Sequence, residues 1–167
     1  MPDFTIRPYQ PADLPAMNDV VGSAWAPFFA MLQERMGPEL FRWVRGEDWQ
    51  VEKMAEVMSL CDEHPEWCLV AEAEGRVVGF VTFVIYSHRP MGEISNNSVD
   101  PAFQGHGVGS GLYRAVLDLF RARGLKCAKV GTGTDEPFAA ARRAYEKVGF
   151  RPMLPHVEYY MPLSEES

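Results

Sequence analysis

The feature that most constrains the fold is a run of four glycines that alternate with other residues over 105–111. Before this run lies a strand-like stretch that Pro101 closes, because proline cannot donate to a strand ladder. After it, Leu112, Ala115 and Val116 begin an apolar stripe at helical spacing. Glycines let the main chain approach a ligand closely, and the free N–H groups that open a helix favour an anion. The segment therefore predicts either a phosphate cradle or a tight turn that needs glycine for steric reasons alone.

Two familiar phosphate loops do not fit this segment. A Walker loop needs glycine followed by lysine, and no such pair occurs in the chain. The dinucleotide fingerprint needs a third glycine where this sequence has Ser110 or Leu112. A nucleotide-hydrolysing or dinucleotide-dependent enzyme is therefore disfavoured.

The rest of the chain alternates between helical and strand-like patterns. Three consecutive strands followed by alternating helices and strands predict a mixed sheet with helices on its faces. We expect five helices: one that begins after Asp13 as its N-cap, one that begins at about residue 38, and three over 49–60, 112–120 and 139–148. We expect strands at 4–7, 67–72, 77–86, 93–99 and 126–131. The last two strands, 151–154 and 157–161, are expected to form a closing hairpin.

Length and composition predict one soluble globular domain spanning 1–167. The chain has 167 residues, of which 47% are hydrophobic, and a typical domain holds roughly 150. Its apolar runs are shorter than the ~20 residues of a membrane-spanning helix, and its first residues do not resemble an export signal, so we expect a cytoplasmic protein with no membrane partner. The three cysteines are too few for a stapled secreted scaffold, so we expect reduced thiols.

A metal site is the alternative interpretation of part of this cysteine set. Cys61, His64 and Cys68 have a spacing that zinc ligands adopt, but no fourth ligand stands nearby. Small buried cysteines are common at a helix end and a strand start. We therefore expect no metal.

The formal charge of −7 is unevenly distributed. Residues 101–151 hold nine Lys and Arg against four Asp and Glu, whereas residues 1–100 hold seven against sixteen. Nucleic-acid binding needs a basic face, so the acidic composition disfavours a nucleic-acid partner. The local excess of cations predicts a small anionic ligand near 101–151, and the acidic remainder is compatible with a cationic partner.

Two motifs in the right order resemble the GCN5-related N-acetyltransferase (GNAT) superfamily. The first is Gln104-x-x-Gly107-x-Gly109, which follows a Val-Asp-Pro strand end, and the second is the segment Tyr-Glu-Lys-Val-Gly-Phe at 145–150. The resemblance implies an α/β (α+β) fold with a mixed, mostly antiparallel sheet of about seven strands and helices on both faces. It also implies acetyl-CoA as cosubstrate and often a homodimer.

The resemblance implies a role for each matching residue. Main-chain groups of Ser98 and Val99 would pair with the pantetheine arm, and Phe138 stands where the family often has an asparagine that contacts this arm. The main chain around the glycines would hold the coenzyme A pyrophosphate, which assigns Gln104, Gly105, His106, Gly107, Val108, Gly109 and Ser110 to the cofactor. The His106 side chain itself is either a phosphate contact or an exposed residue whose main chain alone matters.

Two residues are candidates for proton transfer. The resemblance places Tyr145 beside the thioester sulfur, where its phenol is a proton source for the departing thiolate; otherwise Tyr145 is a core aromatic on an amphipathic helix. An alkylamine is almost wholly protonated at neutral pH, so something must remove its proton. Glu93, on the strand that enters the glycine segment, is the candidate base; the alternative is a solvated glutamate. Asp135 and Glu136 are weaker candidates.

The predicted function is transfer of an acetyl group from acetyl-CoA directly to a primary amine. The N-terminal aromatic residues, among them Trp25, Phe28 and Phe29, form core or a subunit interface, and in the family these helices also wall the acceptor site. A small-molecule amine is preferred because no peptide-binding signature is recognisable. Two alternatives stay open: a protein or peptide amine acceptor, and a noncatalytic acyl-CoA-binding regulatory module.

Overall fold

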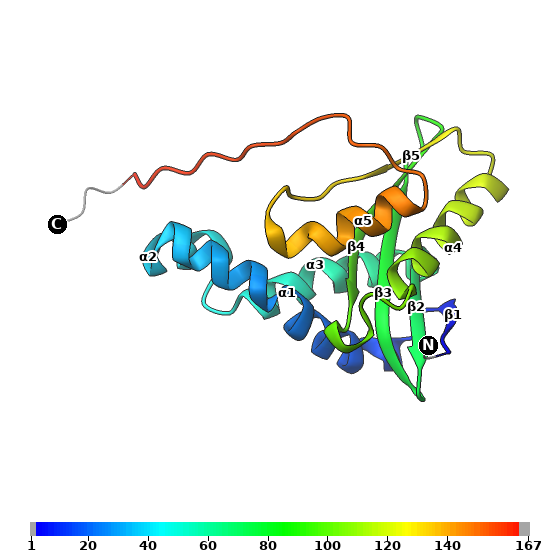
Figure 1. Ribbon diagram of the computed structural model, residues 1–167, viewed down its shortest axis with the longest axis horizontal. Coiled ribbons are helices and arrows are strands. Elements are labelled where there is room, and N and C mark those ends of the chain that lie inside the picture. Colours follow the sequence, from blue (N-terminus) through cyan, green and yellow to red (C-terminus); the bar gives the residue numbers. More distant parts are fainter. Residues whose placement is uncertain (1–2, 164–167) are drawn as a thin grey trace.

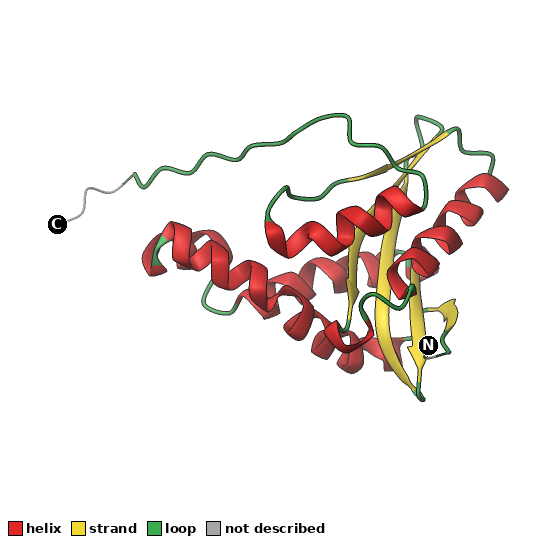
Figure 2. Cartoon of the chain, in the orientation of Figure 1, coloured by secondary structure: helices red, strands yellow, loops and turns green. Residues whose placement is uncertain are grey.

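The computed structural model describes residues 3–163, which form five strands and five α-helices around one sheet (Figures 1 and 2). In chain order the elements are β1 (Thr5–Pro8), α1 (Leu14–Met36), α2 (Pro38–Arg45), α3 (Trp49–Glu63), β2 (Cys68–Ala73), β3 (Arg76–Ile85), β4 (Met91–Val99), α4 (Val108–Ala122), β5 (Cys127–Val130) and α5 (Ala139–Lys147). The predicted helices and the first five predicted strands are all present.

The strands follow one another across the sheet in the order β1-β2-β3-β4-β5. The first three pairings are antiparallel, and β4 pairs with β5 in parallel. This arrangement confirms the mixed, mostly antiparallel sheet. The described residues contain five strands rather than the expected seven.

The missing strands are those of the predicted closing hairpin, so that prediction is wrong for this structure. After α5 the chain runs extended to residue 163 without strand pairing (red in Figure 1). Leu154 and Tyr159 are both 91% exposed, so the apolar side chains of this segment have no sheet face to cover. Pro152 and Pro155 cannot donate to a ladder, which leaves fewer hydrogen bonds to hold a hairpin at this edge.

Each face of the sheet buries a separate hydrophobic cluster. Helices α4 and α5 cover one face, where Leu112 and Val116 pack against Val81 and Phe83 of β3. Helices α1 and α3 cover the other face, where their apolar residues pack against Phe80. Since the buried residues of β3 alternate between these faces, both helical layers depend on the same strand.

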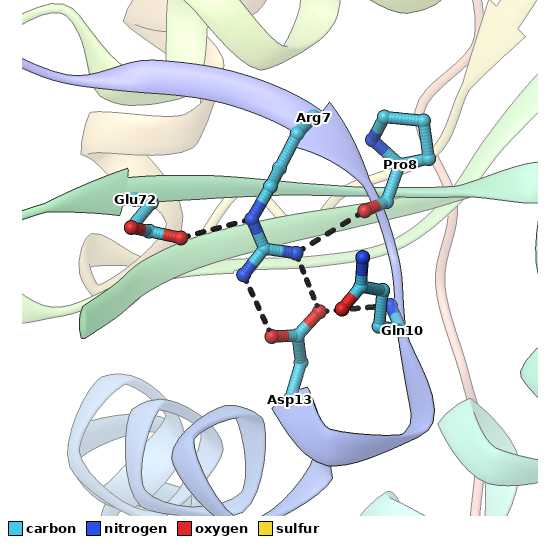
Figure 3. Close-up of polar contacts among 5 residues, drawn as sticks. All are labelled: Arg7, Pro8, Gln10, Asp13 and Glu72. Carbon is cyan, nitrogen blue, oxygen red and sulfur yellow. Dashed lines mark hydrogen bonds and ion pairs between the residues drawn. The ribbon is translucent and has the colours of Figure 1, made fainter. Parts of the chain in front are cut away.

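An ion-pair cluster fixes the entry into α1 (Figure 3). Arg7 donates to both carboxylate oxygens of Asp13 at 2.8 Å, to Glu72 at 2.9 Å and to the carbonyl of Pro8 at 3.2 Å. The Asp13 carboxylate also accepts the Gln10 main-chain N–H at 2.8 Å. Asp13 therefore precedes α1 as predicted, but its side chain holds Arg7 instead of capping the helix.

Replacing Asp13 by asparagine should lower the free energy of unfolding by about 2 kcal/mol, because hydrogen bonds to a charged group are lost from a mostly buried site. The hydrogen bonds from Arg7 lower the pKa of Asp13 in the folded state. The carboxylate therefore contributes stability above about pH 4, and this contribution disappears as the pH falls through the folded-state pKa. Urea denaturation at neutral and acidic pH measures both effects.

Asp118, whose side chain is 73% exposed, forms an ion pair with Arg121 and supplies the matched control. An exposed pair contributes little, so Asp118→Asn should change the free energy of unfolding by less than about 0.5 kcal/mol. Equal losses in the two variants would contradict the stabilising role of the Arg7 cluster.

No helix in the 3–163 region combines the length and the apolar character needed to cross a membrane.

Candidate functional site

A cleft opens where two neighbouring strands separate. Strands β4 and β5 pair only over Met91–Ile94 and Cys127–Val130, so the main chain of 95–99 has no strand on that side within the described residues. The cleft has a volume of about 600 Å³ and lies between this stretch, the start of α4 and the inner face of α5. Unpaired strand edges offer main-chain donors and acceptors to a ligand, as they do to an added strand.

The glycine segment forms one wall of this cleft. Gly105 and Gly107 adopt φ of +77° and +88°, in the left-handed region that favours glycine, and Gly107 is the N-cap of α4. A Cβ built on either residue meets no protein atom within 4 Å, so the space beside the turn is open. The N–H groups of the first α4 turn are left without helical partners. The segment is thus a turn that requires glycine, and its role as an anion cradle stays a prediction.

Most of the predicted cofactor residues lie along the cleft. The Gln104 side chain donates to the Val99 carbonyl at 3.1 Å and thereby closes the turn. The cleft lining includes Ser98, Val99, Gln104, Gly105, Gly107, Gly109, Ser110, Phe138 and Tyr145. Two predicted residues do not line it with their side chains: Val108 is buried in the core, and His106 is half-buried with its Nδ1 lacking a hydrogen-bond partner.

Tyr145 lies on the inner face of α5 and is only 5% exposed, yet it lines the cleft. Its ring packs against that of Tyr113 from α4, with 4.7 Å between the centroids. The Asn97 side chain donates to the Tyr145 hydroxyl oxygen at 2.9 Å. Burial raises the pKa of Tyr145, so the phenol keeps its proton at neutral pH. The two interpretations of Tyr145 are therefore compatible, because a core aromatic here also faces the site.

Sequence reasoning missed Asn97, which reaches Tyr145 because of a β-bulge. Phe83 pairs with Ile94 and Val81 with Asn97, so β4 carries one extra residue opposite β3. This bulge turns Asn97 toward the α4 and α5 face, whereas simple alternation from Ile94 would have placed Asn96 there. Asparagine is depleted in β-strands, so two adjacent asparagines within a predicted strand were the sequence feature that could have drawn attention to Asn97.

Aromatic side chains line the end of the cleft that is formed by α1. Phe138 packs against Phe28 and Trp25 of α1, with centroid distances of 4.7 and 5.8 Å. The Trp25 indole donates to the Ser98 hydroxyl at 2.8 Å. Phe138 thus joins the start of α5 to α1 through apolar packing.

Lys53 of α3 also lies at this end and was not singled out from the sequence. Its ammonium lies 4.5 Å from the centre of the Trp25 ring and donates to Asn96 at 2.8 Å. It also pairs with Glu56 at 2.7 Å. The charged side chains that line the cleft in the described part of the chain are all cationic: Lys53, Arg143 and Lys147.

The structure does not bring Glu93 to the cleft. One carboxylate oxygen pairs with Lys129 at 2.9 Å, and the other accepts a hydrogen bond from Tyr86. Despite the opposing effect of burial, these two partners hold the pKa of Glu93 below its usual range. Asp135 pairs with Arg35 at 2.8 Å, and neither Asp135 nor Glu136 lines the cleft. The role of Glu93 as a base stays a prediction.

The described residues contain no group of three or more His, Cys, Asp or Glu side chains placed to hold a metal ion. Cys61 and Cys68 are buried free thiols, and Cys127 is an exposed one.

Comparison with known proteins gives one family match. The model of the acetyltransferase (GNAT) family matches residues 25–150. Mycothiol acetyltransferase of Streptosporangium roseum is 49% identical over 65 residues, which are 39% of this chain and 19% of that protein. N-acetylaspartate synthetase of Rattus norvegicus is 31% identical over 110 residues, which are 65% of this chain and 36% of that one. The matches therefore span only a fifth to about a third of these relatives.

Solved structures share the fold over most of the chain. Ard1 of Thermoplasma volcanium superposes with a TM-score of 0.67 and 26% identity, covering 90% of this chain and 84% of its own. A GNAT-family acetyltransferase of Brucella melitensis in complex with acetyl-CoA gives a TM-score of 0.59 and 22% identity, covering 91% and 85%.

Proposed function

The chain belongs to the GNAT family of acetyltransferases, and from that premise we propose that it transfers the acetyl group of acetyl-CoA to the primary amine of a small molecule. One observation carries the proposal: a single cleft holds both the glycine cradle at the start of α4 and the hydroxyl of Tyr145. The first suits a diphosphate, and the second suits a leaving thiolate. A noncatalytic binding module needs only the cradle.

Three parts of the cleft lining support coenzyme binding in this proposal. In this proposal the diphosphate binds the main-chain N–H groups of 105–110, since the Gln104 N–H already donates to the Pro101 carbonyl. Arg143 and Lys147 of α5 line the same cleft and supply positive charge opposite the phosphates. The unpaired main chain at Ser98 and Val99 matches the amide-bearing pantetheine arm, and Phe138 offers it an apolar neighbour.

Acetyl-CoA supplies a thioester whose acyl carbon is the electrophile. In the balanced reaction the amine nitrogen forms the new C–N bond, the C–S bond breaks, and one amine proton ends on the thiol. Tyr145 donates its proton to the departing sulfur and is reprotonated, through water, by the proton that the amine releases. Burial raises the pKa of Tyr145, so the phenol still carries its proton at neutral pH when the sulfur leaves. A main-chain N–H of 95–99 that lacks a strand partner is placed to stabilise negative charge on the carbonyl oxygen.

No carboxylate lines the cleft in the part of the chain that the structure describes. In this proposal the amine loses its proton to water that enters the cleft. This arrangement predicts a rate that rises with pH toward the pKa of the amine, about 10.4 for an alkylamine.

Glu93→Gln tests the remaining candidate base. Because Lys129 and Tyr86 hold this carboxylate outside the cleft, we expect the neutral-pH and high-pH rates to stay within about threefold of wild type. A large fall at neutral pH that recovers at high pH would instead establish Glu93 as the base, since a free amine at high pH needs none.

The acceptor binds, in this proposal, against the aromatic wall of Trp25, Phe28 and Phe138 with Lys53 beside it. The relatives that share sequence with the chain include enzymes named for mycothiol and for N-acetylaspartate, and these names support a small acceptor. A peptide N-terminus and a protein lysine are the alternatives. Cations in the cleft favour an acceptor that is neutral or anionic apart from its amine.

We also propose that the protein is a single domain, that it is cytoplasmic and that it forms a homodimer. Two clusters that share one sheet support a single domain over 1–167. Free thiols, two of them buried, support the cytoplasm. Exposed apolar residues after α5 support a homodimer, which sedimentation velocity measures directly.

Calorimetry with acetyl-CoA, followed by coenzyme release across a panel of amines, tests the function. Binding with release for small amines is the expected result. Release only with peptides would move the acceptor to the protein class. Tight binding with no release for any amine would make the chain a binding module, and no heat at millimolar acetyl-CoA would overturn the cradle.

A further inference from the structure

Three side chains from three elements meet beneath the cleft. Asn97 of β4 lies between Tyr113 of α4 and Tyr145 of α5. Its Oδ1 accepts the Tyr113 hydroxyl at 2.7 Å, and its Nδ2 donates to the Tyr145 Oη at 2.9 Å. Tyr113 and Tyr145 are 3% and 5% exposed, so water competes little for these hydrogen bonds.

A third, longer contact supports this assignment of the two ends of the Asn97 amide. Its Nδ2 lies 3.5 Å from the main-chain carbonyl of Ser95, a group that only accepts hydrogen bonds. Exchanging the two ends would set an oxygen against that carbonyl. The amide therefore directs a donor at Tyr145 and an acceptor at Tyr113.

This orientation decides where the Tyr145 proton goes. A tyrosine hydroxyl has one hydrogen to donate, and its oxygen already receives the Asn97 N–H. The Tyr145 hydroxyl also lies 3.3 Å from Asn97 Oδ1, which accepts its shorter hydrogen bond, of 2.7 Å, from Tyr113. Because this bond is long, it holds the Tyr145 hydrogen weakly, and a sulfur bound in the cleft competes for that hydrogen.

We propose that Asn97, held by Tyr113, is a positioning residue that aims the Tyr145 proton at the leaving sulfur. The inference rests on the proposed acetyl transfer and adds a group that the family motifs do not include. The Asn97 N–H also stabilises the phenolate that forms as the proton leaves. It thereby opposes burial, which by itself raises the pKa of Tyr145.

Asn97→Asp is the sharpest variant, because it keeps the shape and the acceptor for Tyr113 but replaces the donor with a carboxylate oxygen. That oxygen would draw the Tyr145 hydrogen away from the cleft. We expect kcat to fall about tenfold while KM for acetyl-CoA stays the same, since only a step after binding is affected. Tyr113→Phe, which frees the Asn97 amide to turn, should lower kcat in the same direction by a smaller factor.

Asn18→Asp provides the matched control. Asn18 of α1 accepts a hydrogen bond from Gln50 of α3 at 3.2 Å, outside the cleft. The same chemical change there should leave both kcat and KM unaltered. An equal fall in kcat for the two variants would mean that the loss reflects general destabilisation, and it would overturn the proposal.

A double-mutant cycle separates this inference from the proposed function. If Asn97 acts through Tyr145, Asn97→Asp should have no further effect on kcat in a Tyr145→Phe background. An undiminished loss in that background would overturn the positioning role. If Tyr145→Phe alone leaves kcat unchanged, the acid role of Tyr145 fails instead.

A measurement without substrate completes the test. Asn97→Ala and Tyr145→Phe should be non-additive in urea denaturation of the ligand-free protein, because both remove the same hydrogen bond. Asn18→Ala with Tyr145→Phe should be additive. Additivity in both pairs would show that the Asn97 bond is absent in solution and would overturn the inference.

Discussion

Gly107→Val should weaken acetyl-CoA binding by at least about 100-fold, which corresponds to ~2.7 kcal/mol. Gly107 adopts φ of +88° at the N-cap of α4, a conformation that is strained for a β-branched residue. The new side chain would also fill the open space beside the turn, where no protein atom lies within 4 Å of a Cβ. Isothermal titration calorimetry with acetyl-CoA measures the change.

Gly124 offers a control with the same backbone strain. It lies beyond the other end of α4 with φ of +74°, and a Cβ there also meets nothing within 4 Å. Gly124→Val should therefore cost similar stability but leave acetyl-CoA affinity intact. If Gly107→Val binds as tightly as wild type, the turn is a steric necessity and the phosphates bind elsewhere.

Tyr145→Phe should lower kcat by about 100-fold, within the range expected for loss of a general acid. The ring still packs against Tyr113, so the fold and the affinity for acetyl-CoA should remain. Steady-state kinetics with the best amine, together with calorimetry, measure both quantities.

Tyr9→Phe removes a hydroxyl from another buried tyrosine, in the cluster on the opposite face of the sheet, and should leave kcat unchanged. A loss below about tenfold in Tyr145→Phe, or ~1.4 kcal/mol, would mean that another group protonates the sulfur.

Local patterns predicted most of the fold. Apolar periodicity located the helices, and runs of Val, Phe and Ile located β2 and β3. The prediction of a closing hairpin was wrong. Alternating apolar and polar residues in 151–161 indicate that the segment is able to form a strand, but a strand also needs a free sheet edge to pair with. Sequence patterns do not report whether that edge exists.

The site residues also fall into two groups: those that the sequence predicted and those that depend on tertiary contacts. Glycines at 105 and 107 and the tyrosine at 145 carry chemistry that few other residues supply, so the sequence pointed to them directly. Glu93 was predicted to be a base from its position along a strand. The orientation of its side chain depends instead on Lys129 of β5 and on Tyr86, which follows β3. Asn97 escaped notice because a bulge, visible only in the strand register, turns it toward α5.

The sequence by itself determined the order of elements, the glycine turn that opens α4 and the family. These depend on backbone conformation and periodicity, which are properties of neighbouring residues. Only the tertiary structure decided which side chains share the cleft. Strand separation, the bulge in β4 and the packing of α1 against α5 bring together residues that are far apart in the chain, and such contacts depend on register and packing.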